Sequence, residues 1–122
     1  MPSYPERSRD TRPISWIRAA RRAFGNFPEG PQNAILRALT VAAEGRKADI
    51  AKPLKGFGSG IFEVALKHRT DAYRAVYALQ LEERVWVLHA FKKKARRGTS
   101  TPKKDIDLIR ERLKRLKKEF QQ

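Results

Sequence analysis

The chain has 122 residues, of which 40% are apolar, so it can bury one modest core but not two. Its 28 lysines and arginines against 13 acidic residues give a net charge of +15, whose self-repulsion favours a polyanionic partner, with nucleic acid considered first and a membrane surface second. The lack of cysteine excludes disulfides and thiolate metal sites and fits a reducing cytoplasm, and no run approaches the roughly 20 apolar residues of a membrane span.

The first third of the chain predicts a flexible terminus, a short strand and two helices. Residues 1–11 are polar and proline-rich, unlike a secretory signal, and they lack apolar periodicity. Residues 12–17 are expected to form the strand, and apolar positions three and four residues apart over 17–27 predict a helix. The prolines and glycine of 28–31 interrupt this helix, and Gly45 is expected to end the next one.

The middle of the chain predicts a loop followed by three strands. Residues 52–60 contain one proline and three glycines, which is typical of a loop. Residues 61–68 alternate between apolar and polar side chains, and residues 72–79 and 84–91 are rich in β-branched and aromatic side chains. Because the connectors between these segments are short, we expect an antiparallel meander.

The C-terminal segment predicts a long amphipathic helix. Thr101 is a suitable N-cap and Pro102 a suitable first-turn residue, and an apolar stripe follows over 106–120. The order of elements predicts one small α+β domain over residues 12–120. In this domain, a short N-terminal strand and a two-helix hairpin pack on an antiparallel sheet, with a helix at the C-terminus.

Positive charge is concentrated near the C-terminus. Residues 92–118 hold thirteen of the 28 cationic side chains and only three acidic ones, which predicts a contact surface for nucleic acid. Lys67, Arg69 and Arg74 are expected near the same sheet. Arg74 would project from the face opposite its neighbouring tyrosines, and the alternative is that it pairs with Glu63 or with Asp71.

Such cationic side chains could cleave RNA without a metal, and two histidines with no cysteine make a metal site unexpected. The 2′-hydroxyl of RNA can act as nucleophile, and lysine or arginine can stabilise the charge that develops on the phosphoryl oxygens. Mutual repulsion among Lys92, Lys93 and Lys94 favours a neutral amine on one of them, which could transfer a proton. The alternative for this run is a solvated turn.

His89 is the histidine candidate for proton transfer, because histidine is the side chain that titrates nearest neutral pH. It also lies near the end of the last expected strand. Regular alternation would place it on one face with Val85, Val87 and Phe91. The alternative is therefore a core or edge-strand histidine.

Three motifs carry a resemblance to a known family. They are "KPLKG" before the first meander strand, "YR-x-x-Y" in the second, and "H-x-F-x-KK" followed by "TPKKDI" at the last helix. With these motifs the sequence resembles, over residues 14–116, the toxins of the RelE/ParE superfamily. It looks most similar to the phage-derived, HigB-like branch of type II toxin–antitoxin toxins.

The resemblance implies the fold already expected, together with a function. Such toxins are usually ribonucleases that cut mRNA, often on the ribosome, and a cognate antitoxin, in this branch a small helix-turn-helix protein, silences them. The family's catalytic basic positions match Arg74, Lys92 and Lys93, and His89 is the further candidate. We expect RNA binding by the remaining cations near this site, which are Lys67, Arg69, Lys94, Arg96 and Arg97.

The sequence departs from the family in two places. No tyrosine follows Tyr77 to match the proton-transfer tyrosine of some members, which leaves His89, a lysine or Glu63 as the base. The connector after the last strand is also longer than usual, so Arg96 and Arg97 either extend the RNA contact or belong to a solvated loop.

Two other functions are compatible with the composition. The superfamily also contains gyrase poisons, which cut no RNA, and a non-enzymatic nucleic-acid-binding protein would account for the charge. The lysine cluster beside Arg74 favours the ribonuclease over the poison. The positive charge is expected in a folded sheet and not in a disordered tail, which argues against a non-enzymatic nucleic-acid-binding protein.

Overall fold

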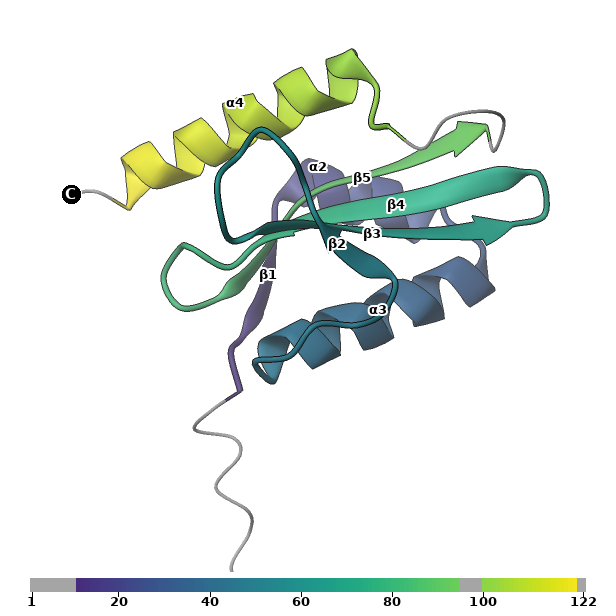
Figure 1. The fold of residues 1–122 in the computed structure, drawn as a ribbon, viewed down its shortest axis with the longest axis horizontal. Helices are drawn as coiled ribbons and strands as arrows, with labels where there is room; N and C mark the ends of the chain where they lie inside the picture. Colours follow the sequence, from purple (N-terminus) through teal and green to yellow (C-terminus); the bar gives the residue numbers. More distant parts are fainter. Residues whose placement is uncertain (1–10, 95–99, 121–122) are drawn as a thin grey trace, which may run out of the picture.

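The computed structural model describes residues 11–94 and 100–120, which form one mixed sheet with helices on both faces (Figure 1). The elements in chain order are β1 (Ile14–Trp16), α2 (Arg18–Gly25), α3 (Glu29–Ala43), β2 (Ala51–Pro53), β3 (Ile61–His68), β4 (Asp71–Ala78), β5 (Val85–Lys94) and α4 (Lys103–Glu119). The sheet order is β1-β5-β4-β3-β2, in which β1 runs parallel to β5 and the other pairs are antiparallel. The expected α+β architecture is confirmed.

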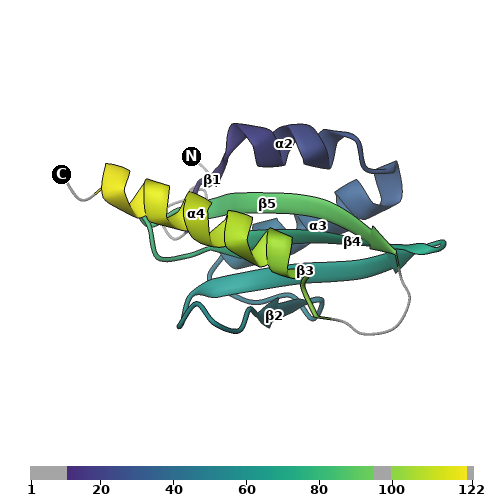
Figure 2. The same cartoon turned by 90° about the horizontal axis from the view of Figure 1, so that it is seen from above.

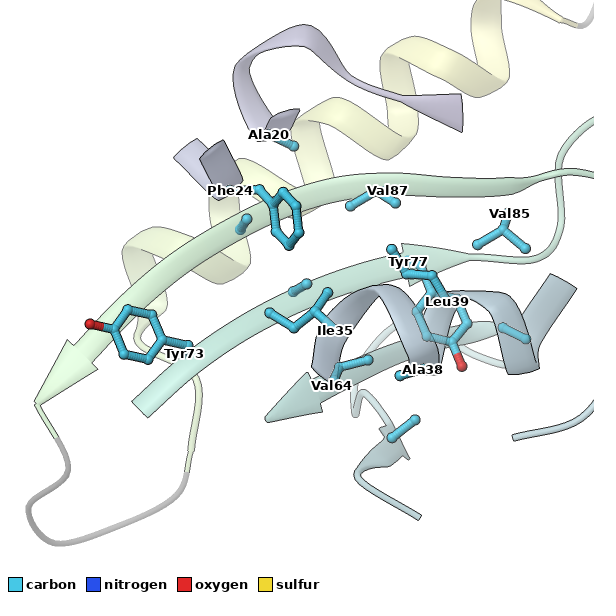
Figure 3. Close-up of a cluster of buried hydrophobic side chains, with 14 of the residues drawn as sticks. Ala20, Phe24, Ile35, Ala38, Leu39, Val64, Tyr73, Tyr77, Val85 and Val87 are labelled. Atoms are coloured by element: carbon cyan, nitrogen blue, oxygen red, sulfur yellow. The ribbon is translucent and has the colours of Figure 1, made fainter. Parts of the chain in front are cut away.

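Helices α2 and α3 cover one face of the sheet, and α4 lies on the other (Figure 2). The apolar positions of α2 and α3 recur at helical spacing, so each helix presents one apolar stripe to the sheet. Phe24, Ile35 and Leu39 from these helices pack with Val64 and Tyr77 from the strands, all of them buried (Figure 3). This cluster is the larger part of the core.

A second buried cluster of the same domain lies between the sheet and α4. Ile109 and Leu113 of α4 are buried against Ile61, Val76 and Leu88 of the strands. The stripe expected over residues 106–120 therefore forms the contact, mainly through its middle part.

Three expectations about element ends were wrong. Residues 52 and 53 belong to β2, because the first part of the expected loop pairs with β3; a proline is tolerated there because β2 is an edge strand. Strand β5 continues through Lys94 instead of ending at Phe91. Pro102 is the N-cap of α4, and no side-chain hydrogen bond caps this helix, so Thr101 is not its cap.

The connector between β4 and β5 contains a tight turn with an unusual sequence. Glu82 and Glu83 have φ angles of 54° and 52°, and the Arg84 amide donates to the Leu81 carbonyl over 3.0 Å. Positive φ at both central residues is the conformation of a type I′ turn, in which Asn-Gly is favoured. The turn therefore forms although neither of its two central residues is glycine or asparagine.

The described residues contain no helix that is both long and apolar enough to cross a membrane. Residues 1–10 lie outside the described part of the chain, so the flexible terminus at 1–11 and the boundary of the domain at residue 12 stay predictions.

Candidate nucleic-acid interface

The candidate site lies on the face of the sheet that carries α4, beyond the point where α4 begins. Strand register places Lys67, Ala72 and Lys93 side by side across β3, β4 and β5. The next row toward α4 is Ala65, Arg74 and Phe91. The row after that is Lys52, Glu63, Val76 and His89, which extends onto β2. Figure 1 shows these strand ends reaching past the start of α4.

Arg74 occupies the centre of this face and is buried, with 5% of its surface exposed. Its Nη1 lies 3.3 Å from Oε1 of Glu63, and the two side chains form a largely buried ion pair. The pairing with Glu63 that the sequence left as an alternative is therefore present. Arg74 does project from the face opposite Tyr73 and Tyr77, as expected from strand alternation.

The second oxygen of Glu63 binds the segment that leads into α4. Thr101 donates its hydroxyl to Oε2 of Glu63 over 2.8 Å. Thr101 therefore does not cap the helix, because its hydroxyl is used to hold the start of α4 against β3. Glu63 links the central arginine to this segment, and each of its two oxygens has a partner.

Lys92 and Lys93 lie on opposite faces of β5. Lys93 is opposite Ala72, on the face of Arg74, and its Nζ donates to the Ser100 carbonyl over 2.6 Å. Lys92 is opposite Tyr73, on the face that α2 and α3 cover elsewhere, and its Nζ lies 3.9 Å from Oδ2 of Asp71. The run is part of a strand and not a solvated turn, so the structure brings only Lys93 to Arg74.

His89 faces α4 because of an irregularity in β5. Val76 pairs with His89 while Tyr77 pairs with Val87, which leaves Leu88 as the extra residue of a β-bulge. The bulge reverses the alternation, so the expected common face of His89 with Val85 and Val87 was wrong. The expected common face with Phe91 was correct, since the two rings stack with centroids 4.9 Å apart.

His89 is 8% exposed, and its ring is held at both nitrogens. Its Nε2 lies 2.7 Å from Oδ1 of Asp105, and its Nδ1 lies 3.3 Å from Nη1 of Arg112. Since a guanidinium can only donate, Nδ1 accepts and Nε2 carries the proton. Burial lowers the pKa of His89, and Asp105 opposes this effect only in part. His89 therefore ties α4 to β5 as a neutral ring.

The other sequence candidates occupy varied positions. Lys67 is exposed on the Arg74 face, Arg69 is exposed in the two-residue β3–β4 turn with a φ of 60°, and Lys94 is exposed on the same face as Lys92. Arg96 and Arg97 lie outside the described residues.

Sequence reasoning missed one cation on this face. Lys52 is exposed and lies directly opposite Glu63 in the β2–β3 pair. The sequence pattern predicts a loop at this position, because Pro53 and the following glycines dominate it. The signal that could have identified it is the alanine–lysine–proline edge segment, which is too short for periodicity to detect.

The tyrosines of the described residues do not belong to this face. Tyr73 and Tyr77 point into the core beneath α2 and α3, and burial raises the pKa of Tyr77 to about 12. Within residues 11–94 and 100–120, no cluster of three or more histidine, aspartate or glutamate side chains could hold a metal ion. The groups available for chemistry on this face are a carboxylate, a buried guanidinium and flanking ammonium groups.

The arrangement of the sheet and helices is that of a known class of small protein. A mutant of the E. coli toxin RelE in the free state matches with a TM-score of 0.59 at 17% sequence identity, covering 87% of this chain and 98% of that chain. The toxin–antitoxin complex RelBE2 from Mycobacterium tuberculosis matches with a TM-score of 0.47 at 21% identity, covering 70% of this chain and 94% of that chain. The first of these matches establishes that the chain has the RelE fold.

A family model then specifies the relationship further. The model of the phage-derived Gp49-like proteins (DUF891) matches residues 22–114. The chain belongs to the phage-derived Gp49-like family. Together with the fold, this membership confirms the RelE superfamily that the sequence motifs indicated. No curated protein matches the chain.

Proposed function

We propose that this protein is the toxin of a type II toxin–antitoxin system and acts as a metal-independent mRNA endoribonuclease. The observation that supports this proposal is the grouping on one sheet face of Arg74, paired with Glu63, between exposed or half-exposed lysines. A carboxylate can accept a proton, and adjacent cations can bind and polarise a phosphodiester.

The reaction uses the RNA's own 2′-hydroxyl. Glu63 accepts the proton of this hydroxyl as the O2′–P bond forms, and Arg74 stabilises the charge on the non-bridging oxygens. The P–O5′ bond breaks, and Lys93 gives a proton to the leaving O5′. The products are a 2′,3′-cyclic phosphate and a 5′-hydroxyl. When the RNA phosphate binds to Arg74, it replaces Oε1 of Glu63 and frees that oxygen to act as base.

The flanking groups bind RNA or position the reacting ones. Lys67 and Lys52 hold neighbouring phosphates on either side of the central pair. His89 is better suited to positioning than to proton transfer, because it is buried and both of its nitrogens are bonded. In the cell we propose that the substrate is mRNA on the ribosome in the cytoplasm, and that a helix-turn-helix antitoxin silences the toxin.

The test is to express the chain without antitoxin and to map new RNA ends that carry a 5′-hydroxyl. Lys93→Ala should reduce the cleavage rate by about 10²-fold, in the range for loss of one transition-state contact. Glu63→Gln and Arg74→Ala should lower it at least as much. Lys92→Ala is the matched control, since it removes the adjacent lysine from the opposite face and should retain cleavage.

Three results would contradict the proposal. Intact mRNA with trapped gyrase–DNA breaks would indicate a gyrase poison, and RNA that is bound but never cut would indicate a non-enzymatic binding protein. Normal growth with abundant soluble protein would exclude a toxin. Because Lys93 is on the surface, its variant remains informative if Arg74→Ala fails to fold.

A further inference from the structure

A groove of about 640 Å³ lies between the β2–β3 connection and α4. Phe57, which is half-buried, and the buried Leu113 form its apolar floor. Arg110, Lys114 and Lys117 form its cationic side. This combination of an apolar floor and a cationic wall belongs to none of the rows described above.

Arg110 is held in place across this groove. Its guanidinium carbon lies 4.5 Å from the centre of the Phe57 ring, and its Nη1 donates to the Gly56 carbonyl over 3.3 Å. Gly56 has a φ of 91°, and a Cβ at this position would lie 3.7 Å from Nη2 of Arg110. The positive φ is what favours glycine at this position, because the Cβ contact itself would be an ordinary one. Arg110 retains N–H donors for a ligand.

The cations of the groove form a row along α4. Arg110, Lys114, Lys117 and Lys118 are spaced so that they share one side of the helix. Among the residues that the structure describes, none of those lining the groove is acidic. The nearby acidic side chains of α4 have other partners, since Asp107 pairs with Lys103 and Glu111 pairs with Arg115.

We propose that this groove binds single-stranded RNA outside the cleavage site. Lysines of the row contact the phosphates, and a base lies against Phe57 and the Arg110 guanidinium, in the way that single strands combine backbone charge with stacking. The role as a substrate contact rests on the proposed ribonuclease function. The binding of RNA does not, because it requires no cleavage.

The position of the groove suits an RNA strand that also occupies the sheet-face site. The helix that carries the row begins beside the sheet-face site, where Thr101 binds Glu63. From there α4 rises about 1.5 Å per residue, which places Lys114 about 20 Å from Thr101 along the axis. One extended strand can therefore contact the site and the groove together, whereas a tetranucleotide centred on Arg74 reaches only the site.

The test measures binding of 2′-O-methyl-uridine oligomers, which lack the nucleophile and cannot be cut. Oligomers of about four and about sixteen nucleotides span the usual range of single-strand sites. Lys114→Gln with Lys117→Gln should weaken binding of the long oligomer about tenfold. It should also reduce the slope of log affinity against log salt by about 1.4, at about 0.7 per lost contact. The short oligomer should bind as before.

The matched control removes the same charge elsewhere. Arg22→Gln with Arg37→Gln changes two exposed arginines on α2 and α3, which cover the opposite face. Phe57→Leu is a second variant, which keeps an apolar floor and should weaken long-oligomer binding without changing the salt slope.

Two results would overturn the proposal. Equal losses in the Lys114/Lys117 variant and the Arg22/Arg37 control would mean that bulk charge alone binds RNA. Full RNA affinity in the Lys114/Lys117 variant, with loss of antitoxin binding, would assign the groove to an acidic protein. Cleavage of a short RNA that depends on Lys93 tests the catalytic proposal separately, so the two can fail independently.

Discussion

His89 shows how a single side chain can be chemically conspicuous and yet structural. Its ring lies between Asp105 and Arg112, two residues of α4, and it stacks on Phe91 of its own strand. The folded protein holds the ring neutral because burial outweighs the attraction of Asp105, and Arg112 acts in the same direction as burial. Protonation of His89 should therefore weaken the contact between α4 and the sheet.

We expect the protein to lose stability as the pH falls through the ordinary range of histidine. The pKa of His89 is lower in the folded state than the ordinary histidine value of 6.5, so the unfolded chain binds a proton first. Its contribution is present above pH 6.5 and is lost as the pH falls toward the folded pKa. Each unit of pKa difference corresponds to about 1.4 kcal/mol of unfolding free energy. Urea unfolding at a series of pH values measures this loss.

Substitution separates His89 from the other titrating groups. In His89→Gln the amide can still donate to Asp105 but cannot become charged, so the acid-side slope should flatten. His68→Gln removes the other histidine and should keep the slope. An NMR titration in which the His89 ring protonates above pH 6.5 would refute this account.

At the residue scale, the sequence predicted which residues belong to the candidate site better than it predicted the sheet face on which each one lies. Arg74 was named with Glu63 and Asp71 as alternative partners, and the structure pairs it with Glu63. The choice depends on the register of β3 and β4, which the sequence alone does not give. The difference between Lys92 and Lys93 was not predictable, since it depends on strand β5 continuing past Phe91. The face of His89 depends on the Leu88 bulge, for which the local sequence contains no recognisable signal.

At the scale of elements, the β4–β5 turn is a point of avoidable strain. Glu82 and Glu83 both adopt positive φ, and such positions cost about 1 kcal/mol or more for side chains other than glycine or asparagine. Glu82→Asn with Glu83→Gly should therefore raise the unfolding free energy by about 1 kcal/mol. Chemical denaturation measures the gain.

A matched pair of variants tests the origin of this gain. Glu82→Gln with Glu83→Gln removes the same charge but keeps the side chains, so it should not reproduce the stabilisation. If both double variants are equally stable, charge and not backbone conformation accounts for the effect.

The long elements were predictable and the short or interrupted ones were not. Strand β3 and the α4 stripe follow their periods over many residues, so one irregular position cannot hide them. Strand β2 has three residues, and within the described part of the chain it pairs with β3 alone. No period can be recognised over that length. The start of α4 shifted because the Thr101 hydroxyl binds Glu63, a tertiary contact that overrides the local capping preference.

At the scale of the whole molecule, the net charge of +15 opposes folding unless it is screened or neutralised. We expect the melting temperature to rise with salt, because the screening length falls from about 30 Å at 0.01 M to about 8 Å at 0.15 M. A gain of about 1 kcal/mol would appear as a rise of roughly 4 °C. Thermal unfolding monitored by circular dichroism measures this shift.

Sodium chloride and potassium chloride should act equally if screening is the cause. A melting temperature that stays constant or falls with either salt would show that the cations are already balanced within the fold. An excess of the uncleavable long oligomer should raise the melting temperature further, because the sheet-face site and the groove exist only in the folded state.

The lysines at the end of β5 also bear on self-association of the protein. Strand β1 pairs only with Val85–Val87, so the remainder of this edge of β5 has no strand beside it in the described part of the chain. An open edge is a template for intermolecular strand pairing, and lysines placed on it discourage such association. Lys92 and Lys94, which face away from Arg74, are suited to this protection, so one run of lysines can serve RNA chemistry on one face and resistance to aggregation on the other.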